Sequence, residues 1–152
     1  MKVGIIIVCY NNELDIDIKE CTKHLKEIKD VVFCFVNNNS QDNTYDALKE
    51  INTACKNVSV INISKKKSDT AAVRAGARFM TNQFNLKHLG FVPSNKIIKY
   101  GSLSVLIKEI RNNQFDISSI NPYKENDKGV KLTFFQSLFP ILEHLEKQLV
   151  NN

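Results

Sequence analysis

The chain lacks the sequence features of a membrane-spanning or secreted protein. No run approaches the roughly 18 consecutive apolar residues that a membrane-spanning helix needs. Met1 and Lys2 lead directly into an apolar run, without the pattern of a signal peptide. Hydrophobic residues make up 43% of the chain and charged residues 24%, which is ordinary for a globular domain. We therefore expect a single cytoplasmic domain over residues 1–152, with no transmembrane segment.

Patterns of metal-binding and disulfide-forming residues are missing as well. The four cysteines show no C-x-x-C spacing, and no two of the three histidines lie at helical spacing. The sequence therefore indicates no zinc site. Buried, reduced thiols are favoured over metal-binding or disulfide roles for Cys9, Cys21, Cys34 and Cys55.

The net charge is positive, but the chain has no long basic tract. The 21 Lys and Arg residues exceed the 16 Asp and Glu residues, which gives a formal charge of +5, and one cluster lies at Lys65–Lys67. Such an excess suits anionic partners, for example nucleotide diphosphates. Aromatic residues are not interleaved with the basic ones, so nucleic-acid binding is disfavoured as a function.

Apolar runs with strand character alternate with segments of helical periodicity. This alternation predicts an α/β fold with three layers, α/β/α, around a mostly parallel sheet. Strands are expected at Val3–Cys9, Val31–Val36, Val58–Ile63, Leu89–Val92 and Phe115–Ile120. Helices are expected over Asp15–Lys29, from a cap at Ser40 or Asp42 to about Ala54, and over Thr70–Asn82, Leu103–Asn112 and Lys131–Val150.

Two of these helices carry a residue that disfavours helical structure. Gly76 lies inside one of them, where glycine costs up to about 1 kcal/mol relative to alanine, and close packing on the sheet would account for it. Pro140 is expected to kink or restart the C-terminal helix. That helix either packs on the core or docks a partner protein or a second copy of the chain, through Phe134, Phe135, Leu138 and Phe139.

Three loops that follow expected strands are rich in polar residues: Cys9–Glu13, Asn37–Asp42 and Pro93–Lys96. In an open parallel sheet, ligands bind outside the carboxyl ends of the strands, near a switch point in the strand order. We therefore expect the three loops to converge on one crevice.

Several polar residues in or near these loops allow two interpretations. Tyr10 either stacks on a base or belongs to the edge of the core. Arg74 either faces a diphosphate or forms an ion pair with a helix carboxylate. Likewise, Lys65–Lys67 either face a diphosphate or form a solvated loop. Three further residues either contact a ligand or cap the second helix: Ser40, Asp42 and Thr44.

Five short motifs follow one another along most of the chain: Val8–Glu13, Val36–Thr44, Ser68–Gly76, Pro93–Asn95 and Asp116–Tyr123. In order and spacing they resemble the P-x-Y-N-E-x, V-D-D-G-S-x-D-x-T, G-K-G-x-A-x-R-x-G, D-A-D and D-V-V-x-G-S-R-Y motifs of family 2 glycosyltransferases. The nearest subgroup resembles the dolichol- or polyprenyl-phosphate sugar synthases. The resemblance implies a GT-A fold with a Rossmann-like nucleotide-binding half, here residues 1–96, and a shortened C-terminal part, residues 97–152.

The resemblance implies transfer of a sugar from a nucleotide donor, aided by Mg²⁺ or Mn²⁺ on the D-x-D acids. Here Pro93 and Asn95 replace those acids, and neutral oxygens are poor ligands for a hard dication. Asn37 and Asn38 replace the acid pair that contacts base and ribose in the family, although an Asn carbonyl still accepts from a base N–H. No metal ligand or catalytic residue is assigned. The implied nucleotide-binding residues are Cys9, Tyr10, Asn11, Glu13, Asn37, Asn38, Ser40, Arg74, Ser94 and Asn95.

Two functions follow from these motifs. The first is a family 2-like glycosyltransferase that acts on a nucleotide sugar, and the order of the motifs favours it. The second is a non-catalytic module that binds a nucleotide or a protein and scaffolds or regulates a complete transferase. The missing acids favour the second, as does the absence after Asn95 of any motif resembling the family's acceptor-binding part.

Overall fold

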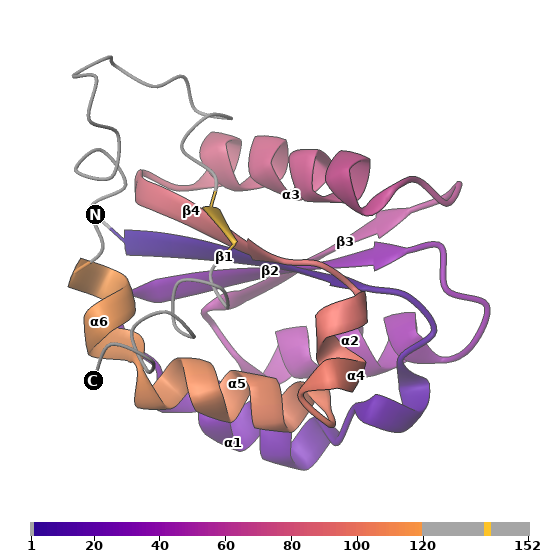
Figure 1. The fold of residues 1–152 in the computed structure, drawn as a ribbon, viewed down its shortest axis with the longest axis horizontal. Helices are drawn as coiled ribbons and strands as arrows, with labels where there is room; N and C mark the ends of the chain where they lie inside the picture. The colour runs from indigo at the N-terminus through magenta and orange to yellow at the C-terminus, as the bar shows by residue number, and fades with distance from the viewer. Residues whose placement is uncertain (1, 120–138, 141–152) are drawn as a thin grey trace.

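The computed structural model describes residues 2–119 and 139–140 of the 152-residue chain. Five strands form one all-parallel sheet in the order β3-β2-β1-β4-β5 (Figure 1). They are β1 Lys2–Cys9, β2 Val31–Asn38, β3 Val58–Ile63, β4 Leu86–Val92 and β5 Phe139–Pro140. The helices are η1 Glu13–Asp15, α1 Ile18–Lys26, α2 Thr44–Ala54, α3 Asp69–Gln83, α4 Asn95–Lys99, α5 Leu103–Asn112 and α6 Gln114–Ser119. In this described part, no helix is long and apolar enough to cross a lipid bilayer.

Helices cover both faces of the sheet, which confirms the expected three-layer α/β fold. In Figure 1, α3 lies on one face, and α1, α2 and α5 lie on the other. Successive residues of a strand point to opposite faces, so Ile5 and Ile7 join the core under α1, α2 and α5. Ile6 and Val8 join the second core, under α3. Since β1 and β2 are buried on both faces, their sequences are continuous apolar runs rather than alternating ones.

The strand order reverses beside β1. The chain runs from β1 outward through β2 to β3, and β4 then pairs with the other side of β1. All paired strands are parallel, so their carboxyl ends lie together at one edge of the sheet, at the right of Figure 1. We call this edge the carboxyl edge. A reversal of this kind is where open α/β sheets bind their ligands.

Gly76 allows α3 to pack closely on the sheet, as the sequence predicted. A Cβ atom at this position would lie 2.8 Å from Cγ2 of Ile6 and 3.0 Å from Cγ2 of Val36. Gly76 is buried, and α3 contacts both β1 and β2. The cost of a glycine inside the helix is therefore offset by close contact between the helix and the two central strands.

Two helices, α6 and α4, were not predicted from the sequence. The segment expected as a strand at Phe115–Ile120 forms helix α6 as far as Ser119, with Ile117 as its buried residue. Its apolar run is too short for periodicity to distinguish strand from helix, and the Ile117 N–H donates to the Asn113 carbonyl oxygen at 3.0 Å, which continues the turn after α5. The second difference is α4, a short helix after Pro93 that the sequence analysis missed.

The C-terminal prediction was wrong at the two residues that the structure describes there. Phe139 and Pro140 form β5 next to β4, with Gly90 paired to Phe139, where a helix was expected. Pro140 lacks an N–H to donate, and an edge strand such as β5 accommodates that. The rest of the expected helix over Lys131–Val150, with its docking residues Phe134, Phe135 and Leu138, lies outside the described residues.

The four cysteines are free and buried, which confirms the sequence prediction. Burial raises the pKa of the thiols of Cys21 and Cys34 to about 12. Burial also raises the pKa of the Cys9 thiol, with a further contribution from Cys21. Thiols with such pKa values stay protonated at neutral pH and pack as small apolar groups.

His24 joins α1 to α5 and is held neutral. The Arg111 guanidinium donates to Nδ1 of His24 at 2.9 Å and to the Glu27 carboxylate at 2.9 Å. Burial, and then the charge of Arg111, lower the pKa of His24 from its ordinary value of 6.5. Burial also lowers the pKa of His88. A hydrogen bond with the Ile117 backbone acts in the opposite direction but is the smaller effect.

These two histidines should make the protein less stable in mild acid. A lowered pKa in the folded state means that the unfolded chain binds more protons below about pH 6.5, so stability is full above that pH and falls as the pH drops below it. Each group adds at most about 1.4 kcal/mol per pH unit. Urea unfolding between about pH 7.5 and pH 5.5 should therefore show a steeper loss for the native chain than for the His24→Gln/His88→Gln variant. Equal slopes would contradict the assignment.

Candidate functional site

The loops after β1 and β2 are joined at the carboxyl edge. The N–H of Asn11 donates to the hydroxyl of Ser40 at 3.0 Å, and the N–H of Gln41 donates to Oδ1 of Asn11 at 2.8 Å. Asn11 and Asn39 have φ angles of 51° and 55°. Asn tolerates this left-handed region better than most residues, so the Asn-rich sequence suits the two tight turns. The convergence of these two loops was predicted from the sequence.

The acids of these two loops bind the start of α2. Asp42 accepts hydrogen bonds from the Thr44 N–H at 3.0 Å, the Thr44 hydroxyl at 2.6 Å and the Glu13 N–H at 3.2 Å. Partial burial raises the pKa of Asp42, but these hydrogen bonds outweigh it and lower the pKa from its ordinary value of 3.8. The Glu13 carboxylate accepts from the N–H of Asn43 at 3.3 Å and from its Nδ2 at 3.1 Å. Asp42 therefore binds the first N–H of α2 from the position before the N-cap residue, Asn43, whereas Ser40 binds Asn11.

Asn37 has a buried acceptor without a donor. It is the partner of Asn62 in the β2–β3 ladder, and its Nδ2 donates to Oδ1 of Asn62 at 2.8 Å. Asn37 is 2% exposed, and its Oδ1 has no hydrogen-bond partner in the described structure. A buried carbonyl oxygen without a donor costs about 1–3 kcal/mol, which a ligand N–H could recover.

Asn38 binds both backbone polar groups of Lys67 with its side-chain amide. Its Nδ2 donates to the carbonyl oxygen of Lys67 at 2.8 Å, and its Oδ1 accepts from the Lys67 N–H at 3.0 Å. Asn38 is 1% exposed. The side chain therefore fixes the loop between β3 and α3 through one donated and one accepted hydrogen bond.

The loop between β3 and α3 also contacts the ends of β1 and β4. The Lys66 ammonium lies 3.8 Å from the centroid of the Tyr10 ring, just after β1. The Asp69 carboxylate accepts from the Ser94 N–H at 3.0 Å and from the Ser94 hydroxyl at 3.1 and 3.0 Å, just after β4. Together with the Asn38–Lys67 pair, these contacts hold the loop across three strand ends.

The residues at the carboxyl edge do not fit a divalent cation. Pro93, Ser94 and Asn95 offer only neutral oxygens, and both oxygens of the neighbouring Asp69 carboxylate accept from Ser94. Over residues 2–119 and 139–140, no three His, Cys, Asp or Glu side chains are grouped so as to hold a metal ion. Mg²⁺ at a nucleotide site is commonly held by one or two carboxylates together with phosphate oxygens. The described acids at this edge already accept hydrogen bonds, so this donor set is poorly suited to the metal implied by the resemblance.

The remaining predicted site residues differ in how much of their side chains a ligand could reach. The Cys9 side chain is fully buried, so only its backbone could meet a ligand. Arg74 is exposed on α3, away from the buried side of that helix, and forms no ion pair within the described residues. Asn95 is exposed at the start of α4. The sequence analysis missed Asn62 and Asp69, and the only signal for Asp69 was its position within the third motif.

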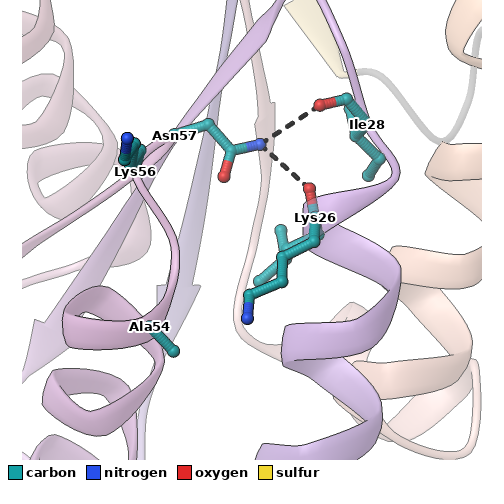
Figure 2. Close-up of a pocket in the computed structure, with 6 residues that line it drawn as sticks. Lys26, Ile28, Ala54, Lys56 and Asn57 are labelled. Carbon is teal, nitrogen blue, oxygen red and sulfur yellow. Dashed lines mark hydrogen bonds between the residues drawn. The ribbon is translucent and has the colours of Figure 1, made fainter.

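The structure also contains pockets away from this edge. One of about 450 Å³ lies between the ends of α1 and α2, at the opposite edge of the sheet (Figure 2). There Asn57 donates from Nδ2 to the carbonyl oxygens of Leu25 at 3.1 Å and Ile28 at 3.4 Å, which satisfies the end of α1. A second pocket of about 380 Å³ lies between Glu13 and α2, and its acids, Glu13, Asp46 and Glu50, would repel a phosphate.

Comparisons with known proteins identify the family of this chain. The family model described as glycosyl transferase family 2 matches residues 4–150. Among solved structures, the mannosyltransferase PcManGT from Pyrobaculum calidifontis in complex with GDP-Man and Mn²⁺ is 16% identical with a TM-score of 0.45, over 52% of this chain and 24% of that one. S. aureus TarS is 18% identical with a TM-score of 0.48, over 60% of this chain and 16% of TarS. The search of curated proteins gave no match.

This chain therefore spans about a quarter or less of the two solved structures, 24% and 16% of their lengths. The family match, by contrast, covers nearly all of it, and the all-parallel sheet with helices on both faces is the GT-A-like arrangement expected from the five motifs. The chain belongs to glycosyl transferase family 2.

Proposed function

We propose that the carboxyl edge binds the nucleotide part of a nucleotide sugar and that the protein transfers the sugar, in the manner of dolichol- or polyprenyl-phosphate sugar synthases. The observation that supports nucleotide binding is the Asn37 Oδ1 atom, which is a buried acceptor without a donor near the end of β2. A uracil or guanine base presents a ring N–H that would complete this hydrogen bond. Family membership supports the transfer itself.

In such a transfer, an acceptor hydroxyl oxygen bonds to the anomeric carbon of the sugar. The bond between that carbon and the diphosphate oxygen breaks, and the electron pair stays on the departing nucleoside diphosphate. The hydroxyl proton passes to a base, for which we assign no residue. Positive charge and N–H donors at the carboxyl edge would stabilise the negative charge of the leaving group.

The test is a calorimetric titration with UDP, GDP and their sugar conjugates, with and without Mn²⁺, followed by an assay of transfer and hydrolysis. We expect nucleotide binding that Asn37→Ala weakens about tenfold, because the base N–H loses its acceptor. Asn82→Ala, at an exposed position of α3, is the control and should leave affinity unchanged. Lack of binding at millimolar nucleotide, in a folded native chain, would refute the proposal.

The second candidate is a non-catalytic module of the same fold that scaffolds or regulates a complete transferase. The observation that favours it is the use of Glu13, Asp42 and Asp69 in internal hydrogen bonds, which leaves these acids committed to structure. A stable complex or homodimer without turnover would support this function. Efficient sugar transfer by the pure chain would eliminate it.

A further inference from the structure

The loop between β3 and α3 brings three cations to the carboxyl edge. Lys65, Lys66 and Lys67 are exposed, and none of them forms an ion pair within residues 2–119 and 139–140. A lysine loop that is merely solvated does not need a buried side chain to hold its backbone in place. This one has such support, because Asn38 is 1% exposed and binds both backbone polar groups of Lys67.

The position of the loop is set by contacts with residues far away in the sequence. Lys66 lies over the Tyr10 ring, Lys67 binds the end of β2, and Asp69 reaches Ser94 after β4. The loop thereby crosses the ends of the central strands, where the strand order reverses and where ligands of open α/β sheets bind. The Lys66 ammonium therefore lies at the end of β1 and the Lys67 backbone at the end of β2, along the edge proposed above for the donor nucleotide.

The acids of the edge do not cancel this charge for a ligand. Glu13 and Asp42 point their carboxylates at the start of α2, and Asp69 points its own at Ser94. A dication at a diphosphate is usually held by at least one carboxylate, and Glu13, Asp42 and Asp69 are all engaged in hydrogen bonds at the described edge. A diphosphate is negatively charged and binds positive charge and N–H donors. Ammonium groups supply both.

We infer that Lys66 and Lys67 bind the diphosphate of the donor nucleotide directly, in place of the divalent cation used by the family. Two ammonium groups carry the same formal charge as one Mg²⁺ or Mn²⁺ ion. They also need no carboxylate ligands, which agrees with the neutral Pro93-Ser94-Asn95 segment. This inference rests on the proposed function, because it names how the same site holds the diphosphate.

The experiment measures the affinity of UDP, GDP and uridine by calorimetry in EDTA and again in Mn²⁺, at low salt. In EDTA, the diphosphates should bind the native chain, and Mn²⁺ should change the affinity by no more than about twofold. Lys66→Gln/Lys67→Gln should weaken diphosphate binding about tenfold or more, and uridine binding hardly at all. Both lysines are exposed, so the variant should fold normally.

The control removes the same charge from the opposite edge of the sheet. Lys26 and Lys56 are also exposed and lie at the pocket shown in Figure 2. Lys26→Gln/Lys56→Gln should leave diphosphate affinity within about twofold of native. An equal loss in both double variants would mean diffuse attraction to net charge and would overturn the inference.

Two further outcomes distinguish this inference from the proposed function. Diphosphate binding that appears only with Mn²⁺ would overturn the inference and leave the proposed function standing. No binding of any nucleotide or nucleotide sugar, with or without Mn²⁺, would overturn both.

Discussion

Asn38→Asp is expected to lower the free energy of unfolding by about 3 kcal/mol at neutral pH, because it buries a carboxylate against a carbonyl oxygen. The native amide donates to the Lys67 carbonyl oxygen and accepts from the Lys67 N–H, at 2.8 and 3.0 Å. A carboxylate keeps the second bond, but its other oxygen faces the Lys67 carbonyl oxygen. At a position that is 1% exposed, water cannot relieve that repulsion.

The pH dependence of this variant is the stronger test. A protonated carboxyl has one donor and one acceptor, like the amide, so folding should raise the pKa of the introduced group above its unfolded value of about 3.9. Stability contributed by protonation is then present below about pH 4 and is lost as the pH rises through the raised pKa. Urea unfolding should therefore show the penalty growing from acid to neutral pH.

Asn52→Asp is the matched control, because Asn52 is exposed on α2. It makes the same chemical change in water and should shift stability by no more than about 0.5 kcal/mol. If Asn38→Asp behaved like this control at neutral pH, the paired contact with Lys67 would be ruled out. We therefore expect an ionised family acid at this position to be poorly compatible with the loop geometry described here.

Gly76→Val is expected to destabilise the protein by about 3 kcal/mol, through overpacking between α3 and the sheet. Even a single Cβ atom would lie 2.8 Å from Ile6 and 3.0 Å from Val36, and valine adds two methyl groups to it. Both neighbours belong to central strands buried on both faces, so they have little room to move.

Arg78→Val separates overpacking from helix propensity. Arg78 is exposed on the same helix, so valine there should cost only about 0.5 kcal/mol, the propensity difference of a β-branched residue. Chemical denaturation of both variants gives the comparison. Similar losses would show that α3 can move away from the sheet and that the close approach at Gly76 is not a constraint.

The central elements of the fold were predictable because buried apolar runs alternate with amphipathic helical segments. Strands β1 and β3 and helix α5 have the bounds expected from apolar runs and helical spacing, to within one residue. Strand β2 was predicted to end at Val36 because polar residues follow. It continues through Asn37 and Asn38 because the β2–β3 ladder pairs them with Asn62 and Ile63. That extension depends on pairing with a neighbouring strand. The periodicity of one segment does not predict such pairing.

The site was predictable in its location but not in its contacts. The rule for open parallel sheets correctly brought the loops after β1 and β2 together. The amide pair of Asn38 and the bond from Ser94 to Asp69 depend on the path of the loop after β3. A loop has no periodic pattern that fixes its path, so these partners became visible only in three dimensions.

The contacts of that loop also bear on the order in which the protein folds. Asn38 and Lys67 are 29 residues apart, and Asp69 and Ser94 are 25 apart. Closing chain segments of that length costs entropy that local contacts do not repay, so we expect β1, β2 and β4 to align before these contacts form. The lysine segment would then be among the last parts of the chain to become ordered, and its positive charges would gather only once the sheet beneath them is complete.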